Sequence, residues 1–293
     1  MSTSFNDLPQ ITPFEELTIQ NDFLFQRVMR NKRICKRLIE EILNTKIASI
    51  SFIHTQKAIK SFYDSKGVFL DVTVEDEQRT RYNLEMQVEN RRSKSTGEPL
   101  LPKRTRYYQA MLDADILEKG QAYDKLKPTY IIFICPFDLF HEGRYIYTFR
   151  KLCVENKNLE LNDKATVIFL NAAGKHGDIT SNAKSFLHYV KSHKVTDEFT
   201  QEISSEISKI KRDEKARREY MQYAIKLHDL QNDAYDKGLE RGWQEGLQSG
   251  LERGRQETAI ETAIKLKKRH KMSDQEIADV TELSVEQVQA IRV

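Results

Sequence analysis

The stretch GVFLDVTVEDEQRTRYNLEMQV, residues 67–88, has the pattern of two β-strands joined by a charged turn. Apolar residues take alternate positions in both halves, as in a hairpin that packs one face against a core. If both apolar sets share that face, a turn centred on Gln78 places Asp71 directly opposite Glu85. Two carboxylates so placed repel each other unless a cation lies between them. The hairpin therefore predicts either an unfavourable pair or a cation site.

The cation interpretation depends on the oxygen atoms that the two strands would bring together. They are the carboxylates of Asp71 and Glu85, the backbone carbonyl of Met86 and the side chain of Gln87. Such ligands suit Mg²⁺, which can acidify a water molecule and shield the charge that develops during phosphodiester hydrolysis. The other interpretation is a polar face that simply meets water, and spacing alone favours it. In that case removing either carboxylate leaves the stability of the metal-free protein unchanged or raises it, because the repulsion disappears with the charge.

Length and composition set wide limits on the function. At 293 residues, the chain can form one sizeable core and a smaller module. Lys and Arg number 47 against 44 Asp and Glu, so any nucleic-acid binding must depend on local clusters of charge. Cys35, Cys135 and Cys153 lie in apolar or strand-like surroundings without a CxxC pair, which predicts reduced core thiols. The polar N-terminus and the lack of an apolar run of ~18 residues predict a cytoplasmic protein without a membrane span.

The order of the other expected elements describes a mixed sheet flanked by helices. Residues 21–43 have helical periodicity, with a cap at Asn21 or Asp22 and a break near Asn31. The remaining expected elements are an apolar segment near 47–54, a helix over 103–119, a strand within 128–137 that is buried on both faces, and strand-like runs at 144–152 and 165–172.

From about Asn182 onward the sequence is helical in pattern and highly charged. It contains YDKGLERGWQEGLQSGLERGRQE, residues 235–257, in which glycine recurs at every fourth position. A glycine inside a helix costs ~1 kcal/mol relative to alanine, so this is either not a helix or one whose missing side chains let a second helix approach. A solvated helix and a helix-pairing surface fit equally well, and the second predicts a homo-oligomer. The glycines are Gly238, Gly242, Gly246, Gly250 and Gly254, and Leu239, Trp243, Leu247 and Leu251 follow the first four.

The last segment, SDQEIADVTELSVEQVQAIRV, contains two capping-box patterns, Ser273 with Glu276 and Ser284 with Gln287. It predicts a small helical hairpin that looks like half of a helix-turn-helix. Its second helix offers mostly glutamate and glutamine, a poor phosphate-binding set, so a packing hairpin is favoured over DNA reading. The expected apolar contacts are Ile277, Val280, Leu283, Val285, Val288 and Ile291.

The ordered set of segments resembles the recombination-promoting nuclease and transposase family of bacteria, a branch of the PD-(D/E)xK nuclease superfamily. The resemblance covers most of the chain, and the set is far more specific than any one motif. It is carried by NDFLFQRVM, FLDVTVED, RYNLEMQV, KRTRYYQAMLDADILEKGQAYDKLKPTYIIFI, ICPFDLFHEGRYIYTFRKLC and the glycine-rich tail.

The resemblance implies roles for the hairpin residues. Asp71 corresponds to the metal-binding aspartate, Glu85 to the second acidic ligand, and Gln87 to a position that is lysine in the superfamily pattern. A lysine would place a positive charge beside the attacking water or scissile phosphate, whereas glutamine offers only a neutral amide. The implied catalytic residues are thus Asp71, Glu85 and Gln87, with Mg²⁺ or Mn²⁺ held by Asp71, Glu85 and the carbonyl of Met86.

The resemblance also implies a phosphate-binding group after the hairpin. Arg104, with Tyr107 and Tyr108, matches the family's R-x-x-Y-Y pattern, and Arg104 and Tyr108 are expected to bind DNA phosphate. A salt bridge from Arg104 to a neighbouring carboxylate explains it equally well. Asp22 and Glu41 on the first helix could add a metal ligand, although helix caps and surface charges are the commoner roles of such residues.

The fold implied is α/β, a restriction-endonuclease-like mixed sheet flanked by helices with a helical C-terminal extension. We expect a nuclease-like domain at 14–195, a charged helical extension with the glycine repeat at 196–270, and the helical hairpin at 271–293. The implied function is a Mg²⁺-dependent DNA endonuclease linked to recombination or mobile elements. One alternative is a catalytically weak nuclease fold that binds DNA or assembles with a partner through its tail. The other is a helix-mediated interaction protein whose hairpin carboxylates are only surface charge.

Overall fold

The computed structural model describes residues 11–55, 58–59, 68–69, 71–117, 122–269 and 271–292. Within these residues the N-terminal part forms a six-stranded sheet with the order β1-β4-β5-β6-β8-β7. The β5–β6 and β6–β8 pairs are parallel and the other pairs antiparallel, so the predicted mixed sheet is confirmed. The strands are β1 (Ile50–Thr55), β4 (Val72–Asp76), β5 (Arg81–Met86), β6 (Thr129–Cys135), β7 (Ile146–Phe149) and β8 (Ala165–Asn171).

The β4–β5 hairpin has the register predicted from the sequence. Val72 pairs with Leu84, as a turn centred on Gln78 requires. Both of these side chains are fully buried, which confirms the apolar face of the hairpin. The same register, continued by one residue, sets Asp71 across from Glu85.

The first predicted strand of this hairpin is divided in two. Val68–Phe69 forms β3, which pairs with β2 (Ala58–Ile59) in a separate two-stranded sheet, whereas β4 belongs to the main sheet. The chain changes sheets just before Asp71, and the backbone N–H of Asp71 donates to a side chain. Gly67 and Leu70, which belong to the predicted strand, lie outside the described residues.

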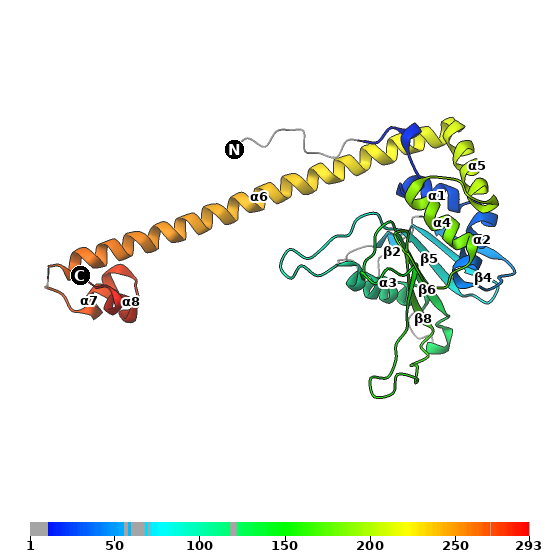
Figure 1. Ribbon diagram of the computed structural model, residues 1–293. Helices are drawn as coiled ribbons and strands as arrows, with labels where there is room; N and C mark the ends of the chain where they lie inside the picture. Colours follow the sequence, from blue (N-terminus) through cyan, green and yellow to red (C-terminus); the bar gives the residue numbers. More distant parts are fainter. Residues whose placement is uncertain are drawn as a thin grey trace. The chain divides into compact units, whose positions relative to one another are not determined.

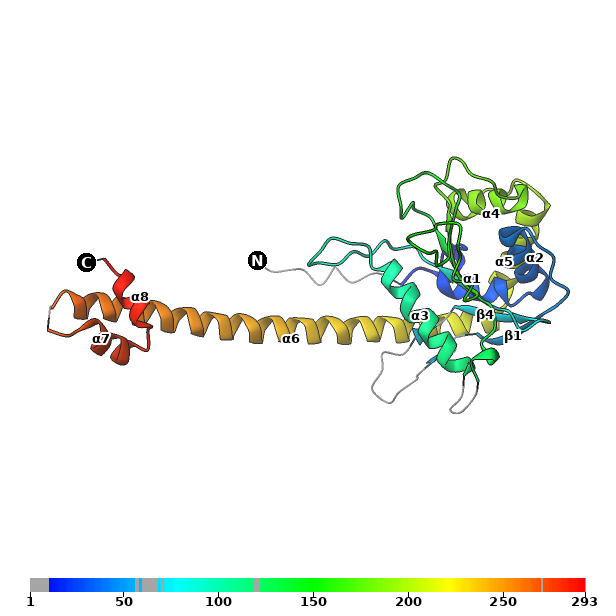
Figure 2. The ribbon, with the colours of Figure 1, turned by 90° about the horizontal axis from the view of Figure 1, so that it is seen from below.

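Helices cover both faces of the six-stranded sheet (Figures 1 and 2). α3 lies against one face, where Leu112 joins Ile131, Phe133 and Phe169 in a buried cluster. The helices α1, α2, α4 and α5 gather on the other face and pack on one another. No helix in the described ranges is long and apolar enough to cross a membrane. The bounds are α1 (Asp22–Met29), α2 (Lys32–Leu43), α3 (Leu101–Ile116), α4 (Ser181–Ser192) and α5 (Glu198–Arg212), with 3-10 turns η2 (Phe14–Glu16) and η3 (Tyr123–Lys125).

Two asparagine caps produce the predicted break in the first helical segment. The side chain of Asn21 accepts from the backbone N–H of Leu24 and begins α1. The side chain of Asn31 accepts from the N–H groups of Arg33 and Ile34 and begins α2. Because these caps satisfy N–H groups that a helix start leaves free, the segment forms two helices instead of one. Asn21, and not Asp22, is the first cap.

The N-terminal compact unit extends to Tyr223, beyond the domain end expected at residue 195. The difference arises because α5 contributes Phe199 and Ile203 to the core, where both are fully buried. The first turns of α6 (Glu214–Lys267) also belong to this unit. There the hydroxyl of Tyr220 donates to the backbone carbonyl of Thr12 at 2.6 Å.

The second compact unit, residues 224–293, contains the rest of α6, α7 (Asp274–Thr281) and α8 (Val285–Ala290). Both predicted capping boxes are present, at Ser273 and at Ser284. Val280 differs from the prediction, because it is 61% exposed and lies outside the apolar cluster. The buried members of that cluster are Ala263, Ile277, Ala278, Leu283 and Val288.

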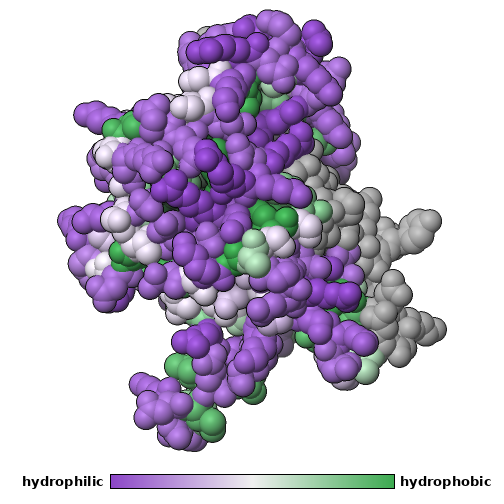
Figure 3. All heavy atoms as spheres, turned by 90° about the vertical axis from the view of Figure 1, so that its right-hand side faces the viewer, coloured by the Kyte–Doolittle hydropathy of each residue, from purple (hydrophilic) through white to green (hydrophobic). Residues whose placement is uncertain are grey.

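The connection between β7 and β8, residues 150–164, forms the projection at the lower end of Figures 1 and 3, with apolar side chains on its surface. Cys153 lies in this segment, and its thiol donates to the carboxylate of Glu155. Cys35 and Cys135 are buried, and all three cysteines are free thiols. The expectation of a core position is therefore confirmed for Cys35 and Cys135 and wrong for Cys153, which is partly exposed.

Candidate active site

Asp71 and Glu85 are held together by the backbone at the end of the hairpin. The N–H of Asp71 donates to Oε1 of Glu85 at 3.0 Å, and the N–H of Met86 donates to Oδ2 of Asp71 at 3.0 Å. Each carboxylate is thus bound by the backbone of the opposite strand. The register confirms that both side chains lie on one face of the hairpin, as the cation interpretation requires.

The middle of the polar face of the hairpin is buried. Glu85 is only 1% exposed, and Thr73 and Asn83 are buried beside it. Glu85 has Phe133 as its neighbour on β6, and Tyr108 of α3 packs against the ring of Phe133. Because α3 covers this face, the expectation of a water-facing carboxylate is wrong for Glu85, while Asp71 is half-buried. The surface placement that the helix-mediated alternative assumes for both carboxylates therefore does not hold for Glu85.

Asn83 supports Glu85 from within the sheet. Its Nδ2 donates to Oε1 of Glu85 at 2.9 Å, and its Oδ1 accepts from the hydroxyl of Thr73 at 3.2 Å. Sequence reasoning overlooked Asn83. The signal was its position two residues before Glu85, which puts both side chains on the same face of β5.

Arg104 of α3 connects Glu85 with Gln87. Its Nη2 lies 3.3 Å from Oε2 of Glu85, and its Nη1 donates to Oε1 of Gln87 at 2.6 Å. Its Nε donates to the hydroxyl of Tyr108 at 2.9 Å, and the guanidinium carbon lies 4.9 Å from the centre of that ring. Tyr108 is buried, so its contacts position Arg104. The salt-bridge role considered for Arg104 is present, and its guanidinium is still partly exposed.

Helix α1 contributes two further polar groups. Nε2 of Gln26, a buried residue, donates to Oδ1 of Asp71 at 3.2 Å. Sequence reasoning did not identify Gln26, although a glutamine within the apolar run FLFQRVM was a usable signal. Asp22 lies close enough to raise the pKa of both Asp71 and Glu85. Glu41 does not join the site, because its carboxylate accepts from Asn182 of α4.

The site resists the ionisation of its carboxyl groups. Burial raises the pKa of Asp71 well above its usual range, and the charge of Glu85 raises it further. Burial also raises the pKa of Glu85 to about 7, against the opposing effect of hydrogen bonds from Asp71 and Asn83 and the charge of Arg104. The pKa of Asp22 is raised to about 6, again mainly by burial. The site therefore favours either protons or a cation.

The donor set fits a small, hard divalent cation. Mg²⁺ is usually held by one or two carboxylates, with water and substrate phosphate completing its shell. A divalent cation would reverse the pKa shifts of Asp71 and Glu85 by favouring their ionised forms. In the part of the chain that the structure describes, no group of three or more His, Cys, Asp or Glu side chains is placed to hold a metal. Asp71, Glu85 and other oxygen atoms, such as the carbonyl of Met86, would therefore share this role.

A comparison with known protein families matches most of the chain. The family model described as PD-(D/E)XK nuclease family transposase matches residues 19–234. The chain belongs to this family. In this PD-(D/E)XK chain the match includes all six strands of the sheet and every residue of the site described above. Comparisons with curated proteins and with solved structures each gave no match.

Glu85→Ala should destabilise the metal-free protein, contrary to the expectation drawn from the sequence. At about pH 6 Glu85 is largely protonated, so the alanine variant removes hydrogen-bond partners of Asn83 and Arg104 without relieving repulsion. We expect a loss of about 3 kcal/mol in the free energy of unfolding, and less than about 1 kcal/mol for Glu85→Gln. Urea denaturation measures both values. Glu89→Ala, at an exposed carboxylate, is the control, and an equally small loss in Glu85→Ala would refute the buried role.

Proposed function

We propose that the protein is a Mg²⁺-dependent DNA endonuclease, with Mn²⁺ as an alternative metal, that hydrolyses phosphodiester bonds. The observation that carries this proposal is the pair of carboxyl groups Asp71 and Glu85. Their burial opposes their ionisation, and the chain belongs to the PD-(D/E)XK nuclease family. The family's description as transposases supports a role in mobile-element movement. We propose that the protein acts in such movement or in recombination, on DNA in the cytoplasm.

Each residue of the site has a distinct role in the proposed reaction. Asp71 and Glu85 hold the cation, which supplies Lewis acidity and charge stabilisation at the scissile phosphate. Gln26 and Asn83 keep the two carboxylates in orientation through their hydrogen bonds. Arg104 presents a partly exposed guanidinium next to Glu85, where it can bind a phosphate oxygen.

Nicking of a supercoiled plasmid tests the proposed function. The wild-type protein should nick the plasmid with Mg²⁺ and leave it intact with EDTA, and Glu85→Gln should leave it intact in both. Glu85→Gln keeps the size of the side chain and removes the charge that the cation requires. Nicking that persists in EDTA would overturn the proposal.

A second candidate function is DNA binding with little or no cleavage. Its support is Gln87, which is neutral where the superfamily pattern has lysine. Both ends of its amide are engaged, because Oε1 accepts from Arg104 and Nε2 donates to the carbonyl of Glu89 at 2.6 Å. DNA binding without nicking in Mg²⁺ or Mn²⁺ would favour this function.

Gln87→Lys should retain or increase cleavage. Gln87 is partly exposed, so a lysine can extend toward the substrate while Arg104 keeps its contact with Glu85. Initial nicking rates of wild type, Gln87→Lys and Gln87→Met test this, since methionine removes the amide without adding charge. Loss of cleavage in both variants would show that the neutral amide itself is required.

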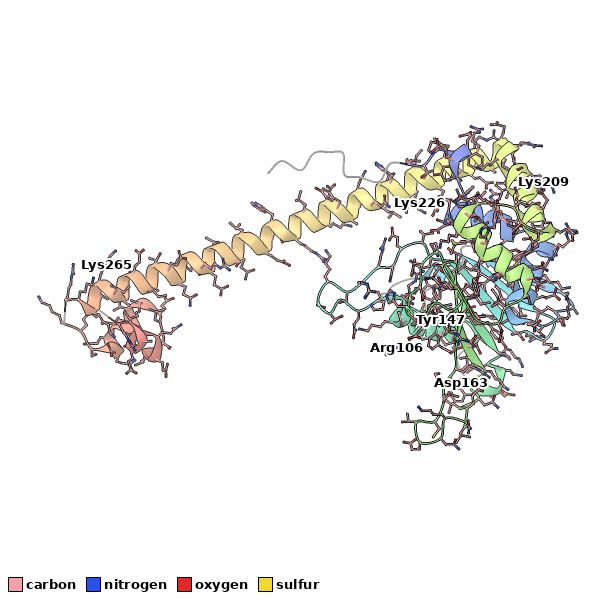
Figure 4. The ribbon with its side chains drawn as sticks, viewed as in Figure 1. Arg106, Tyr147, Asp163, Lys209, Lys226 and Lys265 are labelled. Carbon is pink, nitrogen blue, oxygen red and sulfur yellow. The ribbon has the colours of Figure 1, made fainter. Side chains whose placement is uncertain are left out.

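Arg104→Ala should lower the cleavage rate by about 10- to 100-fold or weaken DNA binding correspondingly, because the charge beside the phosphate is lost. The matched control is Arg106→Ala, two residues further on α3, where the side chain is exposed (Figure 4). Nicking rates and DNA affinity are measured for both variants. Unchanged values in Arg104→Ala would leave Arg104 with only its salt bridge to Glu85.

A further inference from the structure

The glycine repeat lies within a continuous helix, so the interpretation in which it interrupts the helix is excluded. A β-carbon added to any of the five glycines would meet no atom within 4 Å in the described part of the chain. The glycines thus gain no contact there that offsets their helix cost of ~1 kcal/mol each. Figure 4 draws the side chains of this part of α6, between the labelled Lys226 and Lys265.

A row of large, exposed apolar side chains runs beside the glycines. Leu239 is 63% exposed and Trp243, the one tryptophan of the chain, is 69% exposed. A four-residue repeat divides the helix surface into four rows that wind slowly around the axis, because each step turns about 40° beyond a full turn. The first row is glycine and the second is apolar. The third row contains Glu240, Gln244, Gln248 and Glu252, and the fourth contains Arg241, Glu245, Ser249 and Arg253.

We propose that this surface, residues 238–254, binds the same surface of a second copy of the chain in a parallel pair of helices. The glycine row is a groove and the apolar row is a ridge, and helices pack by placing ridges in grooves. In a parallel two-fold pair the ridge of each copy lies in the groove of the other. An antiparallel pair would set ridge against ridge.

The polar rows favour the same orientation. In the parallel pair the third row of one copy faces the fourth row of the other, which sets Glu240 beside Arg241 and Glu252 beside Arg253 of the second copy. In an antiparallel pair each polar row faces itself, and like charges such as Arg241 and Arg253 approach each other. Charge complementarity therefore supports a second copy in the parallel orientation.

The winding of the rows also favours a second copy of the same helix over a helix with a different repeat. A spacing of four residues exceeds the 3.6 residues of a helical turn, so the contact winds around the axis and two helices with the same repeat can follow each other. A helix with a different repeat would leave the row after a few turns. Nucleic acid does not fit the surface, because residues 235–257 contain five acidic and four basic side chains.

Self-association of the full chain tests the pairing independently of nuclease activity. Light scattering should give a mass about twice 34.3 kDa for wild type. The emission of Trp243 should shift to shorter wavelength as the concentration rises. Gly246→Leu should raise the dissociation constant of the pair about tenfold or more, because leucine fills the groove. The same substitution should stabilise the helix of a single chain, since leucine has a higher helix propensity than glycine. Gln248→Leu places the same side chain in a polar row at the border of the contact, where it fills no groove, and should change the constant much less.

A charge exchange tests the orientation. Arg241→Glu with Arg253→Glu should weaken the pair, and adding Glu240→Arg with Glu252→Arg should restore it. A monomeric wild type at micromolar concentration would overturn the proposal, as would a dimer that Gly246→Leu does not weaken. Failure of the fourfold exchange to restore association would overturn the parallel arrangement.

Discussion

Asp71→Asn is expected to reduce Mg²⁺-dependent cleavage by about 10³-fold or more, because it removes one of the two charges that hold the cation. The fold should survive, since asparagine can still accept from the N–H of Met86. Its amide N–H can donate to Oε1 of Gln26 after the side-chain amide of Gln26 flips by about 180°. The measurement is the initial rate of plasmid nicking in Mg²⁺, together with circular dichroism of both proteins.

Glu75→Gln provides the control for this loss. Glu75 lies on β4, the strand that begins directly after Asp71, and its carboxylate pairs with Arg81. Its neutralisation should change the nicking rate less than about twofold. A folded Asp71→Asn protein that nicks DNA as fast as wild type would show that this carboxylate does not take part in the reaction.

The second large effect is a loss of stability as the pH rises in the absence of metal. The pKa of Glu85 in the folded protein is about 7, above its ordinary value of 4.5, and the pKa of Asp71 is raised as well. The unfolded chain therefore ionises first, so the stability that these groups contribute at low pH is lost as the pH rises through about 7. We expect a decrease on the order of 3 kcal/mol in the free energy of unfolding between about pH 5 and pH 8.

Mg²⁺ should reverse this decrease by binding the ionised pair in the folded state, with a gain of about 2.7 kcal/mol at one hundred times its dissociation constant. Asp71→Asn with Glu85→Gln should reduce the decrease to the part that Asp22 contributes, and should abolish the effect of Mg²⁺. Carboxylates with lowered pKa values, such as Asp138 and Asp197, titrate below this pH range, whereas Asp22, with a pKa of about 6, titrates within it. Urea denaturation from about pH 5 to pH 8 gives the curves, and a wild type that gains stability across this range would contradict the assignment.

Local patterns in the sequence predicted much of the fold. The alternation in the hairpin determined the register that sets Asp71 opposite Glu85, and the break expected near Asn31 lies where the side chain of Asn31 caps α2. Such features depend on residues that are close together in the chain, so they can be predicted from a single sequence.

The parts that were missed depend on packing between distant segments. Glu85 is buried because α3 covers its face of the sheet. The alternation of polar and apolar residues in β5 is the same whether its polar face is covered by a helix or exposed to solvent. Gln26 reaches Asp71 across 45 residues of chain. Val280 was expected among the apolar contacts, yet α7 buries Ile277, Ala278 and Thr281 and leaves Val280 exposed.

Calorimetric titration of Mg²⁺ into the DNA-free protein at about pH 8, where both carboxyl groups can release their protons to a cation, tests the central claim most directly. Wild type should bind Mg²⁺ saturably and release protons on binding. The number of protons released is measured by repeating the titration in buffers of different ionisation enthalpy. Asp71→Asn with Glu85→Gln should bind none at this site, and Glu75→Gln should bind like wild type. Equal Mg²⁺ binding by wild type and the double variant, or no binding by wild type, would contradict the assignment of Asp71 and Glu85 as the cation site.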